Sequence, residues 1–113
     1  MTVVMYHNPR CSKSRATLSL LRDRGIEPEV VPYLDAPPDA DTVRRLLQLL
    51  KMAPRDLMRK KEAREAGLAD PDLNDEALIA GMIAHPIVIE RPIVVANGRA
   101  RLGRPPEAVL EIL

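Results

Sequence analysis

The sequence predicts an α/β fold with a mixed four-stranded sheet, and three observations lead to this prediction. A nearly continuous apolar run, Thr2 to Tyr6, precedes a helical pattern and a second strand-like run, Glu27 to Tyr33. Strand, helix and strand within this length form a βαβ unit, so these two strands should be parallel. Near the end of the chain, Asn97-Gly98 separates two further strand-like runs. That dipeptide is a strong short-range signal of a β-hairpin.

The first helix is expected to begin just after Pro9. Asn8-Pro9 ends the first strand, because proline has no N–H for a ladder and disfavours helical angles in the residue before it. Gly25 should end the helix. Its inward face, by i, i+4 spacing, should carry Ala16, Thr17, Leu20, Leu21 and Arg24. Pro32 cannot donate to a ladder, which places the second strand at a sheet edge.

The middle of the chain predicts a helical insertion over about residues 39–85. Asp39 or Asp41 can cap a helix whose apolar face carries Val43, Leu46, Leu47 and Leu50. The charged run 59–65 is interpreted as a solvated helix face rather than a binding patch. Asn74 should cap a further helix that ends before Pro86.

The last third predicts the hairpin and a closing helix. Residues 93–96 and 99–102 should be antiparallel neighbours, and Pro105-Pro106 fits the first turn of a helix that packs Val109, Ile112 and Leu113 inward. The order of elements is that of a thioredoxin-like fold, with the helical insertion between its βαβ and ββα halves. A chain of 113 residues suits one such domain, 1–113.

Composition excludes several classes of function. The chain has no Phe, no Trp and two Tyr, so aromatic stacking on nucleic-acid bases is not available to it. A formal net charge of +1 gives no basic surface for nucleic acid or anionic membrane. No apolar run is long enough to span a membrane, and a cytoplasmic protein is expected. One cysteine excludes an internal disulfide and argues against a metal site built on thiolates.

The single cysteine, Cys11, lies where the first helix should begin. Unpaired N–H groups and the positive end of the helix dipole favour an anion there, and Arg10, Lys13 and Arg15 add positive charge. A lone cysteine is most often a small buried apolar residue. This context instead favours a reactive thiolate.

A thiolate at a helix start serves thiol exchange, acyl transfer or attack on an oxyanion. A cysteine hydrolase needs a base, and the two histidines are His7 and His85. His7 is close enough in sequence to tune Cys11, but an ordinary hydrogen-bonded role fits it as well, and His85 is expected at the surface. Ser14 stands where a thiol exchanger would carry its second cysteine, so a redox cycle would need an external thiol.

Several motifs in order resemble the glutaredoxin-coupled arsenate reductase family, and in particular a short subgroup of it. They are Tyr6-His7-Asn8-Pro9 with Cys11 and Ser14-Arg15, Leu57-Met58-Arg59-Lys60, His85-Pro86, Arg91-Pro92-Ile93-Val94-Val95 and Arg104-Pro105. The resemblance implies that Cys11 attacks arsenate and that Arg59, Arg91 and Arg104 hold the oxyanion. It also implies that His7 influences the cysteine and that the Ser14 hydroxyl lies near it. Guanidinium groups suit this task, because they give parallel charge-assisted hydrogen bonds and stay charged.

The resemblance further implies glutathione as thiol co-substrate and glutaredoxin as protein partner, with no bound cofactor and no metal. Two other classes stay open: a redox-responsive regulator, although the Cys-x-x-Cys switch of such proteins is excluded by Ser14, and a glutathione-binding module without turnover. Finally, thioredoxin-like folds place a cis-proline before the strand that faces the cysteine. The Arg91-Pro92 bond is therefore predicted to be cis.

Overall fold

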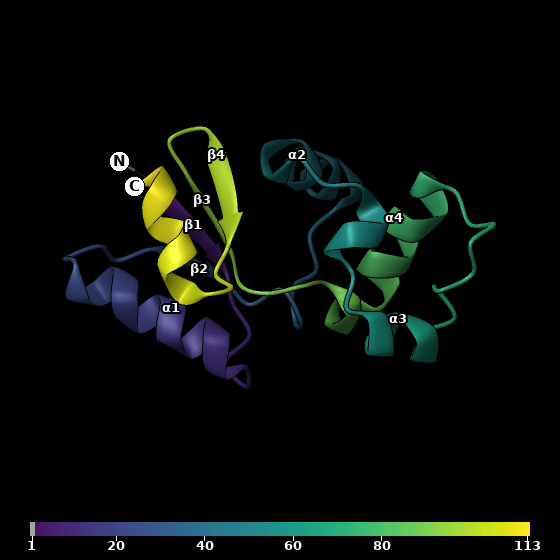
Figure 1. The fold of residues 1–113 in the computed structure, drawn as a ribbon, viewed down its shortest axis with the longest axis horizontal. Helices are drawn as coiled ribbons and strands as arrows, with labels where there is room; N and C mark the ends of the chain where they lie inside the picture. Colours follow the sequence, from purple (N-terminus) through teal and green to yellow (C-terminus); the bar gives the residue numbers. More distant parts are fainter. Residues whose placement is uncertain (1) are drawn as a thin grey trace. The chain divides into compact units, whose positions relative to one another are not determined.

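The computed structural model describes residues 2–113 and divides into two compact units. The sheet unit consists of residues 2–36 with Arg91–Leu113, and the helical unit is Pro37–Glu90. Each unit is described by itself below, and Figure 1 labels their elements. The expectation of one domain over residues 1–113 stays a prediction.

The sheet unit is built on a mixed four-stranded sheet in the order β2-β1-β3-β4. Strand β1 (Val3–Tyr6) pairs in parallel with β2 (Glu29–Val31), and antiparallel with β3 (Ile93–Ala96). Strand β4 (Arg99–Leu102) completes the hairpin with β3. The predicted βαβ unit, edge strand and hairpin are confirmed, although β2 is shorter than expected and ends just before Pro32.

Helix α1 (Ser12–Asp23) follows β1, with Cys11 as its N-cap and Gly25 in the left-handed region after its last turn. Its predicted inward face is partly wrong, because Ala16 and Arg24 are exposed. The buried positions are Ser14, Thr17 and Leu21. Thr17 and Leu21 are therefore inward as predicted, whereas Ser14 was missed, since a search for apolar spacing does not count serine as an inward residue.

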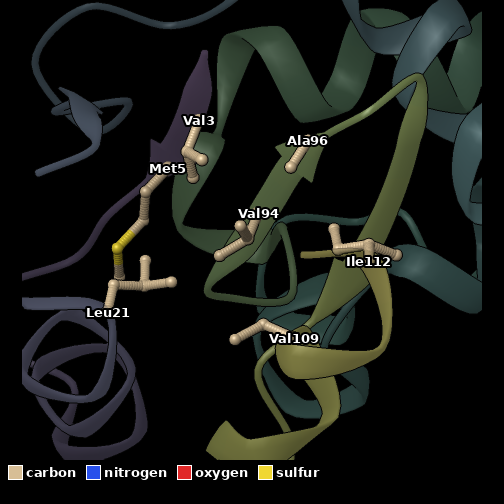
Figure 2. Close-up of a cluster of buried hydrophobic side chains, with 7 residues drawn as sticks. All are labelled: Val3, Met5, Leu21, Val94, Ala96, Val109 and Ile112. Carbon is tan, nitrogen blue, oxygen red and sulfur yellow. The ribbon is translucent and has the colours of Figure 1, made fainter. Parts of the chain in front are cut away.

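A cluster of aliphatic side chains forms the core of the sheet unit (Figure 2). Alternate residues of β1 and β3 supply one face of the sheet, and α1 and the C-terminal helix cover it. The buried members are Val3, Met5, Leu21, Val94, Ala96, Val109 and Ile112. This core packs α1 against the sheet through Leu21, near the end of the helix.

The C-terminal helix η3 (Pro106–Ile112) is a 3₁₀ helix. Pro105 is its N-cap and accepts a hydrogen bond from the N–H of Ala108 at 3.0 Å. As predicted, Val109 and Ile112 are buried, and Leu113 is half-buried.

The helical unit contains α2 (Ala40–Leu50), α3 (Lys60–Glu65) and α4 (Asp75–Ala84), with 3₁₀ turns η1 (Pro54–Leu57) and η2 (Pro86–Val88). The expected caps are present: Asp39 accepts from the N–H of Thr42, and Asn74 from that of Ala77. Met58 and Ile89 form an isolated antiparallel bridge that ties η1 to the segment after η2. None of the helices in the described chain is both long and apolar enough to cross a membrane.

Candidate active site

Cys11 lies in a turn that its neighbours hold through backbone hydrogen bonds. Its N–H donates to the carbonyl of Asn8 at 3.0 Å, and its carbonyl accepts from the N–H of Arg15 at 3.0 Å. The Asn8 side-chain oxygen accepts from the N–H of Arg10 at 2.9 Å. Asn8 therefore shapes the turn that presents Cys11, and the thiol itself is only partly covered.

A buried polar cluster of His7, Asn8 and Ser14 stabilises this turn. The Ser14 hydroxyl lies 2.7 Å from Nδ1 of His7 and accepts from the N–H of Asn8 at 3.1 Å. All three residues are buried. Burial, followed by the positive charges of Arg22 and Arg15, lowers the pKa of His7, so its imidazole is neutral at neutral pH.

The pKa of the Cys11 thiol is lowered although burial acts to raise it. The N–H of Ser14, the guanidinium of Arg91 and the N–H of Lys13 all favour the thiolate and together outweigh burial. Donors and a cation thus surround the sulfur, which is the chemistry of an anion site.

Arg91 and Arg104 lie opposite each other in the register of the β3–β4 hairpin, just beyond the ends of the two strands. The last ladder pair is Ile93 with Leu102. The N–H of Gly103 continues the pairing by donating to the carbonyl of Pro92 at 3.0 Å, and Nη1 of Arg104 donates to the carbonyl of Arg91 at 3.2 Å. The Arg91-Pro92 bond is cis, as predicted, and so is the Arg104-Pro105 bond.

The Arg91 guanidinium is directed at the Cys11 sulfur and retains unused donors. Its Nε and Nη1 atoms are buried and have no hydrogen-bond partner within residues 2–113. Buried donors without a partner are rare in proteins, because each costs free energy. Two such donors beside the Cys11 thiol leave positions at which an anion would accept hydrogen bonds.

Gly103 lets the end of the hairpin pack directly on α1. A Cβ at this position would overlap Oγ1 of Thr17 and lie 2.7 Å from Cγ of Pro92. Thr17 is fully buried, and its hydroxyl donates to the carbonyl of Lys13 at 2.8 Å. This close approach fixes Pro92, and with it Arg91, relative to the helix that begins at Cys11.

Arg15 and Arg59, also singled out in the sequence, have different surroundings. Arg15 is exposed and donates to the carbonyl of Pro9 at 2.9 Å, so it braces the turn before Cys11. Arg59 belongs to the helical unit. There it is the N-cap of α3, its N–H donates to the carbonyl of Val88 at 2.7 Å, and its Nε lies 3.3 Å from Oε2 of Glu62. Its part in an anion site stays a prediction.

Asn8, Thr17 and Gly103 were not recognised as site residues in the sequence. The signal for Asn8 was present, since Asn before proline is typical of side-chain-bonded turns. Thr17 and Gly103 act through a contact between segments far apart in the chain, and a single sequence gives no sign of it.

A mixed four-stranded sheet in the order β2-β1-β3-β4, with a partly covered thiol where α1 begins, defines a thioredoxin-like protein with a single cysteine. The chain belongs to the ArsC family, whose model matches residues 6–112. It is 60% identical over 98% of its length to the uncharacterized protein YfgD of Escherichia coli K12, of which it covers 96%. It is 48% identical to an arsenate reductase of Neisseria meningitidis serogroup A, covering 98% of this chain and 97% of the relative. The structure of an arsenate reductase from Vibrio cholerae matches with a TM-score of 0.96 at 55% identity, covering 100% of this chain and 98% of that one.

Proposed function

We propose that the protein is a thiol-dependent oxidoreductase that reduces arsenate, or a similar oxyanion, through the Cys11 thiolate. The observation that carries this proposal is the pair of unused donors on Arg91 beside a thiol whose pKa is lowered. Relatives named arsenate reductase, at 48% and 55% identity, support the choice of substrate. Arg104, level with Arg91, and Arg59 are proposed as the other two arginines that hold the anion.

In the first step the thiolate attacks arsenic(V), a sulfur–arsenic bond forms, and one oxygen leaves as water after protonation. Guanidinium groups stabilise the negative charge on the remaining oxygens and stay charged throughout. The neutral His7, bonded to Ser14, is proposed to hold the turn and its helix start rather than to act as a base.

An external thiol is needed next, because the chain has one cysteine and Ser14 at the position of a resolving one. A glutathione thiolate displaces a second oxygen from arsenic as water. A glutaredoxin thiolate then attacks the glutathione sulfur, the sulfur–arsenic electron pair returns to arsenic, and a mixed disulfide of glutathione and glutaredoxin is released. Arsenic gains the two electrons that the two thiols lose, and hydrolysis of the remaining bond frees arsenite and Cys11. Such thiols are plentiful in reducing compartments, so we infer a cytoplasmic location.

The test is formation of arsenite from arsenate with glutathione and glutaredoxin. Cys11→Ser should abolish turnover, and Arg91→Ala should reduce kcat/KM for arsenate by at least tenfold, since it removes a charge-assisted contact. Arg24→Ala, an exposed arginine at the end of α1, is the matched control and should change neither parameter. Arsenite formation that persists in Cys11→Ser, or an absence of turnover in the unaltered protein, would overturn the proposal.

A further inference from the structure

A hollow of about 440 Å³ lies within the helical unit, where η1, α3 and the segment after α3 line it. Its volume is within the range of small-molecule sites, about 300–1,000 Å³. All of its lining residues belong to this unit, and none of them takes part in the proposed reaction at Cys11. The hollow is therefore a candidate site for a second ligand.

Hydrogen bonds hold the walls of this hollow in place. The guanidinium of Arg55 donates to the carbonyls of Leu68 and Asp70, at 3.4 and 3.0 Å, and so ties η1 to the segment after α3. Gly67, in the left-handed region, ends α3, and the N–H of Leu68 donates to the carbonyl of Ala63 at 2.8 Å. The hollow is therefore largely preformed.

Part of the lining is apolar, and two cations without a partner lie on it. Met58 and Ala63, both buried, supply the apolar surface together with Ala69. Lys60 and Arg64 are four residues apart on α3, and neither side chain has a hydrogen bond or an ion pair within residues 2–113. Like charges at this spacing destabilise a helix, so an anionic group between them would replace a repulsion with two attractions.

The other two charged residues of the lining limit the ligand to one negative group. The Arg55 guanidinium is already used by backbone carbonyls. Asp56, on η1, lines the same hollow and would repel a second anionic group. A dianion would meet that repulsion, an inorganic anion would leave the apolar surface uncovered, and an uncharged molecule would leave both cations of α3 without a partner.

We propose that this hollow binds a small monocarboxylate with an apolar body. The carboxylate would lie between Lys60 and Arg64, and the apolar body would cover Met58 and Ala63, where its burial is favourable. The inference goes beyond the proposed function, since it involves neither Cys11 nor arsenate.

The test uses octanoate as the probe and octanamide as its uncharged counterpart of equal length. Titration of the unaltered protein, followed by NMR, should give saturable shifts at residues 55–58 and 60–69, and octanamide should bind about fivefold more weakly or worse. Lys60→Ala and Arg64→Ala should each weaken octanoate binding about two- to fivefold, as expected for exposed ion pairs. Lys61→Ala, an exposed lysine of α3 that does not line the hollow, is the matched control and should leave the affinity unchanged.

A second variant tests the hollow itself rather than its charge. Ala69→Leu adds carbon at an exposed lining position, so it should occupy part of the space and weaken octanoate binding. Ala80→Leu makes the same change at an exposed alanine of α4 and should have no effect.

Losses of affinity in Lys60→Ala, Arg64→Ala and Ala69→Leu, with both controls unchanged, support the site whether or not arsenate is reduced. Equal binding of octanoate and octanamide, shifts that centre elsewhere, an affinity that none of these variants alters, or no saturable binding would overturn it. Inorganic phosphate that binds the same residues as tightly as octanoate would overturn it as well, because the apolar surface would then contribute nothing.

Discussion

At the scale of single residues, the pKa of Cys11 is set by opposing effects of burial and of nearby donors, and one substitution can change their balance. Burial favours the neutral thiol, while Arg91 and two N–H groups favour the thiolate. Arg91→Ala should therefore move the midpoint of Cys11 alkylation to higher pH, and Arg24→Ala should not. The measurement is the rate of iodoacetamide reaction against pH. A midpoint in the unaltered protein at about 8.5, the value of a free thiol, would contradict an activated cysteine.

The same lowered pKa has a consequence for stability. A thiol that ionises at lower pH in the folded chain than in the unfolded chain adds stability as the pH rises between the two pKa values. That contribution is complete above the unfolded value and is lost as the pH falls through the folded one. The difference in unfolding free energy between the unaltered protein and Cys11→Ser should thus grow from neutral to mildly alkaline pH. Urea titrations at several pH values would measure it, and a difference that does not vary with pH would contradict it.

Ser14 is expected to matter more for the fold than for the thiol. Ser14→Ala would leave Nδ1 of His7 and the N–H of Asn8 buried without this partner, at a cost of about 1–3 kcal/mol. The Ser14 N–H that favours the thiolate is unaffected, so the alkylation midpoint should hardly move. Urea unfolding and alkylation of the same variant separate the two effects. Ser12→Ala, an exposed serine two residues earlier in α1, is the control.

At the scale of elements, the contact between α1 and the β3–β4 hairpin is the feature that joins Cys11 to Arg91. Gly103→Ala would push a methyl group into Thr17 and Pro92, which is an overpacking cost of about 1–3 kcal/mol. We expect lower stability together with a higher alkylation midpoint, because the guanidinium would shift. Adding Thr17→Ala removes one of the two overlaps and should recover part of the loss. If the double variant is no better than the sum of the singles, the contact is not what fixes the hairpin.

At the scale of the whole molecule, binding of an anion should stabilise the folded chain. A ligand at 100 times its Kd adds about 2.7 kcal/mol to the unfolding free energy. Thermal unfolding with and without arsenate should show this increase, and Arg91→Ala should reduce it. Arg24→Ala, an exposed arginine of α1, is the control and should leave the increase unchanged.

Prediction from sequence succeeded where the determinants are local. The Asn97-Gly98 turn and the flanking alternation define the hairpin, and Pro9 and Gly25 bracket α1, so both elements could be located. The buried face of α1 was partly missed, because Ser14 lies inward and bonds Nδ1 of His7 and the N–H of Asn8, whereas apolar spacing does not count a serine. Gly103 was missed because its role depends on a tertiary contact with Thr17 and Pro92, which the sequence does not reveal. The unused donors of Arg91 could not be predicted from the sequence either, because only the folded chain determines which donors find a hydrogen-bond partner.

The register of the β3–β4 hairpin makes the position of Arg91 depend on the Asn97-Gly98 turn at the opposite end of the hairpin. Arg91 and Arg104 are level because the Asn97-Gly98 turn sets which residues of β3 and β4 face each other. Deleting or inserting one residue in that turn would slide one strand past the other and reverse the faces of its side chains. Arg91 and Arg104 would then no longer lie opposite each other, although neither arginine and no neighbour of Cys11 had been changed. Loop length at the far end of the hairpin is therefore a constraint on chemistry at the near end.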